Sequence, residues 1–234
     1  MTASTELARL GALLADDTRA RFCLALLDGR AWTAGELARH ARVAPSTATE
    51  HLNRLIAAGL CAEERQGRHR YVRLAGPHIA ALLEDLTALF EPVPPPVRSL
   101  KDATVANALA RGRTCYDHLA GRLGVAVTDA MTDTGLLQQT KGFALTDAGL
   151  DWLTGTLGID AETLHRTRRP LVRGCLDWTE RRPHLAGTAG ALICRHFLDR
   201  RWVVRIGSGR AVRVTPSGRA ALRGLLDLDP AVLD

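Results

Sequence analysis

The chain has 234 residues, of which 46% are apolar, 24% charged and only 4% aromatic, and its formal net charge is +6. This apolar content suffices for one large or two modest packed domains. No apolar run has the length of a membrane span and no signal-peptide pattern opens the chain, so we expect a cytoplasmic protein with no membrane partner. Five cysteines in such a chain are expected to be reduced thiols rather than a disulfide framework.

The positive charge is unevenly placed. Residues 1–97 carry 11 Arg against 11 Asp and Glu, whereas the remainder carries 20 Lys and Arg against 14 acidic residues. The first third of the chain therefore has no net excess of charge. Its basic residues are nevertheless clustered, at Arg54, Arg65, Arg68, Arg70 and Arg73, which is a local pattern suited to a polyanion.

The N-terminal residues predict three short helices. The first has an apolar stripe of four leucines: Leu7, Leu10, Leu13 and Leu14. Asp17 or Thr18 is expected to cap the second helix, which runs to Gly29. Thr33 and Glu36 have the spacing of a capping box and open the third helix, which we expect to end near His40.

The stretch from Val43 to Gly59 predicts a helix suited to a DNA groove. Its apolar residues recur at helical spacing and form one inward stripe: Ala48, Leu52, Leu55 and Ile56. Pro45 fits the first turn, and Gly59 suits the left-handed conformation that ends a helix. The other face carries hydroxyl and basic side chains that can donate to phosphates or base edges. We predict that five of them contact DNA: Ser46, Thr47, Thr49, His51 and Arg54.

A β-hairpin is predicted directly after this helix, with strands over residues 60–65 and 69–74 and a turn that contains Gly67. Its tip concentrates cationic donors, which we expect to lie along the minor groove or the backbone of DNA: Arg65, Arg68, His69 and Arg70. The alternative interpretation is an amphipathic helix and a hairpin in a core that has no role in DNA binding.

Several short motifs follow one another in this region: Asp16-Asp17-Thr18-Arg19, Glu36-Leu37-Ala38, Ser46-Thr47, His51-Leu52, Leu55, Ala58-Gly59-Leu60, Gly67-Arg68 and Tyr71. With this series, residues 7–90 resemble the ArsR-type winged helix-turn-helix repressors. The resemblance implies a winged helix over residues 1–91 that binds double-stranded DNA as a homodimer, and it covers little more than the first third of the chain.

A further helix is predicted after Gly76-Pro77, with a wide apolar band: Ile79, Leu82, Leu83, Leu86, Leu89 and Phe90. Together with the leucine-rich first helix, this band resembles the dimer interface of the family, which places two recognition helices about one DNA turn apart. The alternative is that the band packs on the C-terminal half of the same chain, since an exposed apolar stripe needs some partner. Residues 92–97 are proline-rich and predict a linker.

The C-terminal domain, over residues 98–234, contains an internal repeat. His118-Leu-Ala-Gly121 recurs 66 residues later as His184-Leu-Ala-Gly187. Each copy precedes a mostly apolar helix, then a strand that runs into a helix capped by Thr146 or Thr215. We interpret residues 103–158 and 170–228 as two degenerate winged-helix-like repeats, so the fold class is mainly α with short β-wings. The alternative is a chance match between segments rich in Ala, Leu and Gly.

This C-terminal domain is a better candidate for an effector site than the N-terminal winged helix. Cys115 and His118 are spaced i and i+3, which would put a thiol and an imidazole on one face of a helix. If the repeats pair by pseudo-symmetry, His118 and His184 take related positions, and a pocket could form between them. The predicted effector residues are Arg113, Cys115, Tyr116, His118, Cys175, Trp178 and His184. Three interpretations stay open: structural residues, a pocket for an aromatic or anionic ligand, and a metal or redox sensor.

Members of the ArsR family often sense metals through cysteines on the third helix or through paired His and acidic residues on the last dimer helix. Here the third helix has no cysteine, and the last helix has His78 with Glu84 and Asp85 but no second histidine. Cys23 and Cys61 lie among apolar residues and are expected to fill the core. The sequence therefore identifies neither a bound metal nor a cofactor.

The sequence thus predicts a homodimeric transcriptional regulator, a repressor that binds an inverted-repeat operator and whose C-terminal domain senses an effector or stabilises the dimer. We expect no enzymatic activity. Two alternatives remain: a small thiol- or metal-dependent enzyme that uses Cys115 and His118, and a protein-interaction module built on winged-helix scaffolds. No Gly-rich phosphate loop, paired-acid motif or nucleophile elbow supports the enzyme.

Overall fold

The computed structural model describes residues 2–67, 69–89, 100–140, 142–165, 169–207 and 209–229. Residues 1–84 and 85–234 form two compact units, with the boundary inside a helix, α5 (Pro77–Ala88). The predicted linker over residues 92–97 lies outside the described residues, as do Arg68 and Phe90. In the described part of the chain, no helix is both long enough and apolar enough to cross a membrane.

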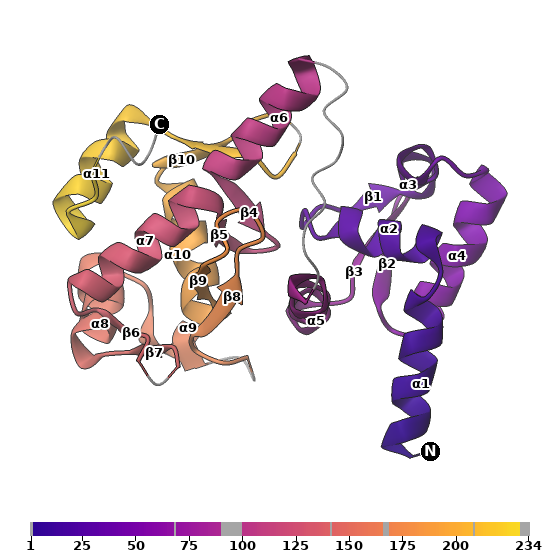
Figure 1. Ribbon diagram of the computed structural model, residues 1–234, viewed down its shortest axis with the longest axis horizontal. Coiled ribbons are helices and arrows are strands. Elements are labelled where there is room, and N and C mark those ends of the chain that lie inside the picture. Colours follow the sequence, from indigo (N-terminus) through magenta and orange to yellow (C-terminus); the bar gives the residue numbers. More distant parts are fainter. Residues whose placement is uncertain are drawn as a thin grey trace. The chain divides into compact units, whose positions relative to one another are not determined.

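The first unit has the predicted order of helices followed by a wing (Figure 1). Its helices are α1 (Ala3–Leu14), α2 (Asp17–Leu26), α3 (Ala34–Ala41) and α4 (Pro45–Ala57). Its strands are β1 (Trp32–Thr33), β2 (Cys61–Gln66) and β3 (His69–Leu74). They form an antiparallel sheet in the order β1-β3-β2, and the first strand of the hairpin begins one residue later than predicted.

The core of this unit lies between the helices and the sheet. Its fully buried side chains include Phe22, Leu26, Leu37, Leu52, Leu55 and Val72. The predicted capping box is confirmed, because Thr33 accepts from the Glu36 N–H and the Glu36 carboxylate accepts from the Thr33 N–H. Gly59 has a φ of 74°, as predicted for the residue that follows the helix. Cys23 and Cys61 are buried, and burial raises the pKa of their thiols to about 11 and about 12.

The predicted cap of the second helix is wrong by one residue. Asp16, rather than Asp17 or Thr18, is the N-cap, and its carboxylate accepts from the Arg19 N–H at 3.0 Å. The Arg19 guanidinium is buried and donates to the Ala12 and Leu13 carbonyls at the end of α1. Asp16 and Arg19 therefore fix the corner between the first two helices.

We expect Asp16→Ala to destabilise this unit by about 1 kcal/mol, the usual cost of losing an N-cap. The bond from the Arg19 N–H, aided by the charge of His51, holds the pKa of Asp16 below its ordinary 3.8. The cap's contribution is therefore full above that pH and is lost as pH falls through the lower pKa of the folded state. Urea unfolding at pH 7 and pH 3 measures both effects. Asp17→Ala is the control, since its exposed pair with Arg21 is worth under about 0.5 kcal/mol.

The second unit contains two segments with the same order of elements. The first runs through β4 (Arg113–Cys115), β5 (His118–Ala120), α7 (Gly121–Asp133), β6 (Leu137–Gln138), β7 (Ala144–Leu145) and α8 (Asp147–Asp151), which continues as a π-helical turn, η1 (Trp152–Thr156). The second runs through β8 (Arg173–Leu176), β9 (Pro183–Ala186), α10 (Gly187–Asp199), β10 (Val203–Arg205), β11 (Val212–Val214) and α11 (Pro216–Leu226). Two further helices are α6 (Leu100–Arg111) and α9 (Ala161–His165).

The two segments pack on each other reciprocally. Helix α7 contacts β9 of the second segment, α10 contacts β5 of the first, and β5 lies beside β9 (Figure 1). The Thr128 hydroxyl on α7 accepts from the Leu185 N–H on β9 at 2.8 Å. The predicted caps are confirmed, because Thr146 and Thr215 each accept from the N–H three residues later at 3.0 Å. One apolar core runs through both segments, with Met131, Leu153, Phe197 and Leu222 fully buried.

Candidate functional site

Helix α4 presents one polar face to solvent. Ala48, Leu52 and Leu55 are buried on its inner side, while Ser46, Glu50 and Arg54 are exposed and Thr47 and Thr49 are partly exposed. No side chain caps the start of the helix. The Thr49 hydroxyl donates to the Pro45 carbonyl, and Arg54 pairs with Glu50 one turn away. These side chains could reach a groove without any change in the helix.

His51 is not on this face. Its side chain is only 15% exposed, and Nδ1 lies 3.5 Å from the Asp16 carboxylate and 3.4 Å from the Arg19 guanidinium. This places His51 against the corner between α1 and α2. Its contact with a base edge stays a prediction, and in the structure the ring contributes to the packing of α4 on α2.

Three arginines of the wing lie among the described residues: Arg65, Arg70 and Arg73, the last of which is exposed on β3. Arg65 is exposed on β2. Arg70 instead donates to the Glu63 carboxylate at 2.6 Å and to the Asn53 amide oxygen at 2.8 Å. Arg70 thereby ties the wing to α4, and Asn53 is a polar residue of this surface that sequence reasoning missed. Arg68 and the side chain of His69 lie outside what the structure describes.

The predicted effector residues of the second unit converge at one point. We predicted that Cys115 and His118 lie on one face of a helix, and this prediction is wrong. They lie opposite each other in the β4–β5 hairpin. Cys175 and His184 are opposite each other in the β8–β9 hairpin. One ligand atom from each of the four side chains lies within 4.8 Å of the others, and all four residues are buried. We call this group the Cys/His cluster.

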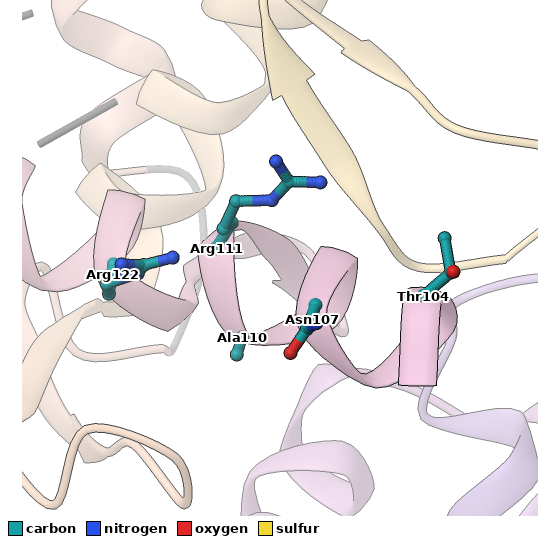
Figure 2. Close-up of a pocket in the computed structure, with 5 residues that line it drawn as sticks. All are labelled: Thr104, Asn107, Ala110, Arg111 and Arg122. Carbon is teal, nitrogen blue, oxygen red and sulfur yellow. The ribbon is translucent and has the colours of Figure 1, made fainter. Parts of the chain in front are cut away.

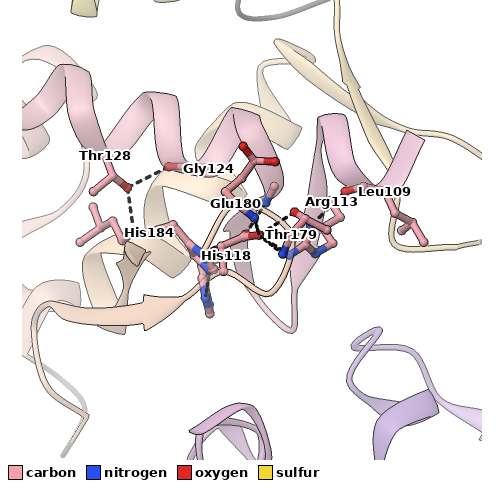
Figure 3. A network of polar contacts seen from close by, with 11 residues as sticks. Leu109, Arg113, His118, Gly124, Thr128, Thr179, Glu180 and His184 are labelled. Atoms are coloured by element: carbon pink, nitrogen blue, oxygen red, sulfur yellow. Dashed lines mark hydrogen bonds and ion pairs between the residues drawn. The ribbon is translucent and has the colours of Figure 1, made fainter. Parts of the chain in front are cut away.

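The two imidazoles of the cluster face each other, and the Nε2 atoms are 3.1 Å apart (Figure 3). The opposite nitrogen of each ring lies beside a carboxylate. His118 Nδ1 is 3.2 Å from Asp117 Oδ1, and His184 Nδ1 is 3.2 Å from Asp177 Oδ2. The site thus has an inner group of two thiols and two imidazoles and an outer pair of carboxylates.

Asp177 also holds the neighbouring backbone together. Its carboxylate accepts from the N–H groups of Gly121, Thr179 and Glu180 and from the Arg113 guanidinium at 2.8 Å. Burial alone would raise the pKa of Asp177, but its contacts with His184 and Arg113 hold that pKa well below its usual range. Burial likewise opposes the charged form of His184, yet the bonds with Asp177 and Cys115 raise its pKa.

Arg113 does not offer its guanidinium to a ligand, as the interpretation of these residues as an anion pocket would require. Arg113 has no exposed surface, and its guanidinium is bonded to Asp177, Thr179 and the Leu109 carbonyl (Figure 3). The Trp178 ring covers it at 4.6 Å. An anion therefore cannot reach this guanidinium. Tyr116 is partly buried in the turn between β4 and β5.

An open pocket of about 430 Å³ does occur elsewhere in this unit, on α6 and the start of α7 (Figure 2). It is lined by Thr104, Asn107, Ala110, Arg111 and Arg122. None of these residues was among the predicted effector residues.

The fold and the α4 surface define a winged helix-turn-helix DNA-binding protein. A model of the helix-turn-helix domain matches residues 14–64. Over 224 residues the chain is 39% identical to the uncharacterized HTH-type transcriptional regulator YdfF of Bacillus subtilis, covering 95% of this chain and 98% of that protein. The chain therefore belongs to the HTH-type transcriptional regulators, with an ArsR-like winged helix at its N-terminus and an added C-terminal domain.

Other relatives match a smaller part of the chain. The HTH-type transcriptional regulator CmtR of Mycobacterium tuberculosis is 42% identical over 82 residues, which are 35% of this chain and 69% of that protein. Among solved structures, the cadmium metal-sensor CmtR of M. tuberculosis is 40% identical and covers 37% of this chain and 85% of its own, with a TM-score of 0.31.

Proposed function

We propose that this transcriptional regulator is a repressor that binds an inverted-repeat operator as a homodimer. The observation that carries the proposal is the exposed polar face of α4, which is held rigidly by the buried stripe behind it. A helix presented in this way fits the major groove, while the wing follows the backbone.

Within this proposal, Ser46, Thr47, Thr49 and Arg54 contact base edges or the phosphates beside them. The wing supplies phosphate contacts from Arg65, Arg68 and His69. Arg70 acts mainly by fixing the wing against α4, because its guanidinium already binds Glu63 and Asn53. Because basic and acidic residues balance in residues 1–97, we expect attraction to DNA to depend on where these arginines lie on the surface rather than on the net charge.

The proposed dimer interface uses α1 and α5. Helix α1 has no buried residue, and Leu7 is 70% exposed although the helix is rich in leucine. Leu89, directly after α5, is 76% exposed. Apolar surface of this kind is expected to be covered by a partner, and a second copy of the same helices would cover it symmetrically.

For the C-terminal domain we propose two degenerate winged-helix-like repeats that sense an effector or stabilise the dimer. Support comes from the shared order of a hairpin, a 13-residue helix, a second hairpin and a capped helix in each segment. In each repeat, the first hairpin (β4–β5 or β8–β9) takes the place in the chain where a winged helix has its second helix. Asp129 and Asp133 on α7 would repel phosphates, so we expect no DNA contact from the first repeat.

The test is a footprint of the purified full chain on the DNA upstream of its own gene, since repressors of this type commonly control their own promoters. Protection of two half-sites one helical turn apart is the expected result. A shift assay with random DNA at increasing salt serves as the reference for electrostatic binding. Absence of both protection and salt-sensitive retention would refute the proposal.

Two arginine variants should separate base reading from phosphate binding. Arg54→Ala is expected to weaken the footprinted site by about 1 to 3 kcal/mol and to leave random DNA nearly unchanged. Arg65→Ala is expected to weaken both DNAs alike and to reduce the salt slope by about one unit. Competition binding at several salt concentrations measures both. Equal losses on the two DNAs for Arg54→Ala would contradict its assignment.

A further inference from the structure

We propose that Cys115, His118, Cys175 and His184 bind one divalent metal ion of the zinc class with tetrahedral geometry. This metal site is not part of the proposed DNA-binding function, and its occupancy can be measured without DNA. It is also separate from the winged helix, since all four residues belong to the second unit.

The spacing of the four side chains suits one ion. A tetrahedral zinc with two thiolate and two imidazole ligands has bond lengths of about 2.3 Å and 2.0 Å, which put its ligand atoms about 3.3 to 3.8 Å apart. The two Nε2 atoms are 3.1 Å apart, and all four ligand atoms lie within 4.8 Å of one another. Contraction of the cluster by about 1 Å would complete the shell.

The outer carboxylates set the tautomer of both rings. Asp117 and Asp177 lie beside the Nδ1 atoms, so each Nδ1 carries its hydrogen and each Nε2 presents a lone pair. Two nitrogens 3.1 Å apart in a buried site can share one cation, either a proton held between the rings or a metal ion that replaces it. Carboxylate–histidine–metal arrangements satisfy both rings at once.

The charges of the site also balance with a divalent ion. Asp177 is paired with Arg113, and Asp117 is paired with Arg169. The outer carboxylates are thus neutralised independently of the cluster. Two thiolates and one divalent cation then leave no net charge in a core where an unpaired charge would be costly. Thiolate and imidazole ligands favour zinc, cadmium or cobalt over magnesium or calcium.

The hairpin registers make this ion a link between the two segments. Each hairpin supplies one thiol and one imidazole from facing strands. An ion held by both pairs would join β4–β5 to β8–β9 at the point where α7 and α10 cross to the other segment. Metal binding is therefore expected to raise the melting temperature of the C-terminal unit.

The experiment is a titration of the full-length chain, stripped of metal by a chelator, with Co²⁺. One equivalent should produce the visible bands of tetrahedral Co²⁺ and a thiolate charge-transfer band, both removed by Zn²⁺ and unaffected by Mg²⁺. Cys115→Ser and Cys175→Ser should each weaken binding by more than the ~10 to 100-fold that follows loss of an outer-shell partner. Cys194→Ser is the matched control, because Cys194 is buried in the same unit outside the cluster.

X-ray absorption of the Zn²⁺-loaded wild-type chain tests the ligand set without any variant. Two sulfur and two nitrogen ligands are expected. A Co²⁺ spectrum without charge transfer, equal binding by Cys115→Ser, or a zinc shell of oxygen ligands would each overturn the proposal. Neither readout involves DNA, so their failure would leave the DNA-binding proposal standing, and a failed footprint would leave this site standing.

Discussion

Asp177→Ala is expected to destabilise the C-terminal unit by about 3 to 5 kcal/mol, a cost typical of removing one partner from a buried ion pair. The Arg113 guanidinium has no exposed surface and would be left in the core without its carboxylate. The N–H groups of Gly121, Thr179 and Glu180 would lose their acceptor in the same substitution. Since a domain of this size is stable by only about 5 to 15 kcal/mol, much of its stability depends on this one side chain.

Asp129→Ala is the matched control for this prediction. Asp129 also pairs with an arginine, Arg182, but both side chains are partly exposed, and such pairs are worth about 0 to 1 kcal/mol. Chemical unfolding of both variants in the presence of a chelator compares them without metal. A loss for Asp177→Ala as small as that for Asp129→Ala would show that Arg113 finds another partner or reaches water.

Gly190→Ala is expected to cost about 1 to 3 kcal/mol or more, because it overpacks the contact between α10 and the hairpins. A Cβ at this position would lie 2.5 Å from the Leu185 carbonyl oxygen and 3.4 Å from the Cβ of His118. Gly124 has the related environment on α7, with the Leu119 carbonyl oxygen at 2.4 Å and the Cβ of His184 at 3.6 Å. Both neighbours include backbone, which cannot move aside as a flexible side chain can.

Gly224→Ala is expected to have the opposite effect on the stability of the C-terminal unit. Gly224 lies in α11, where an added Cβ meets nothing within 4 Å, so the substitution should stabilise by up to about 1 kcal/mol through helix propensity. Thermal unfolding of the Gly190→Ala and Gly224→Ala variants measures the contrast. A neutral Gly190→Ala would mean that α10 can shift away from the strand.

The N-terminal unit could be predicted closely because its signals are local. The Thr33 and Glu36 capping box, the Gly59 terminus and the apolar stripe of α4 each depend on a few neighbouring residues. The surroundings of His51 could not be predicted, because they are set by Arg19 of α2, which is 32 residues away in the sequence. The role of Arg70 depends in the same way on Asn53 and Glu63, which only the folded wing brings near it.

In the C-terminal unit, the repeat of the His-Leu-Ala-Gly motif was the useful signal. It related His118 to His184, and the structure brings those two rings into contact. The spacing of Cys115 and His118 fits a helix as well as a tight hairpin, and the sequence could not decide between them. Only the hairpin makes the two residues cross-strand neighbours. Asp117 directly precedes the motif, yet the position of its carboxylate beside the His118 ring depends on the turn that the hairpin forms.

The reciprocal packing of α7 and α10 has a consequence for synthesis on the ribosome. The first unit closes its core with contacts among its own early residues, so it can fold while later residues are still being added. The β4–β5 hairpin, in contrast, packs against α10. Arg113 of this hairpin can form its ion pair only after Asp177, 64 residues further along the chain, has been synthesised. The C-terminal domain therefore stays open until nearly the whole polypeptide has emerged, and then gains both halves of its core together.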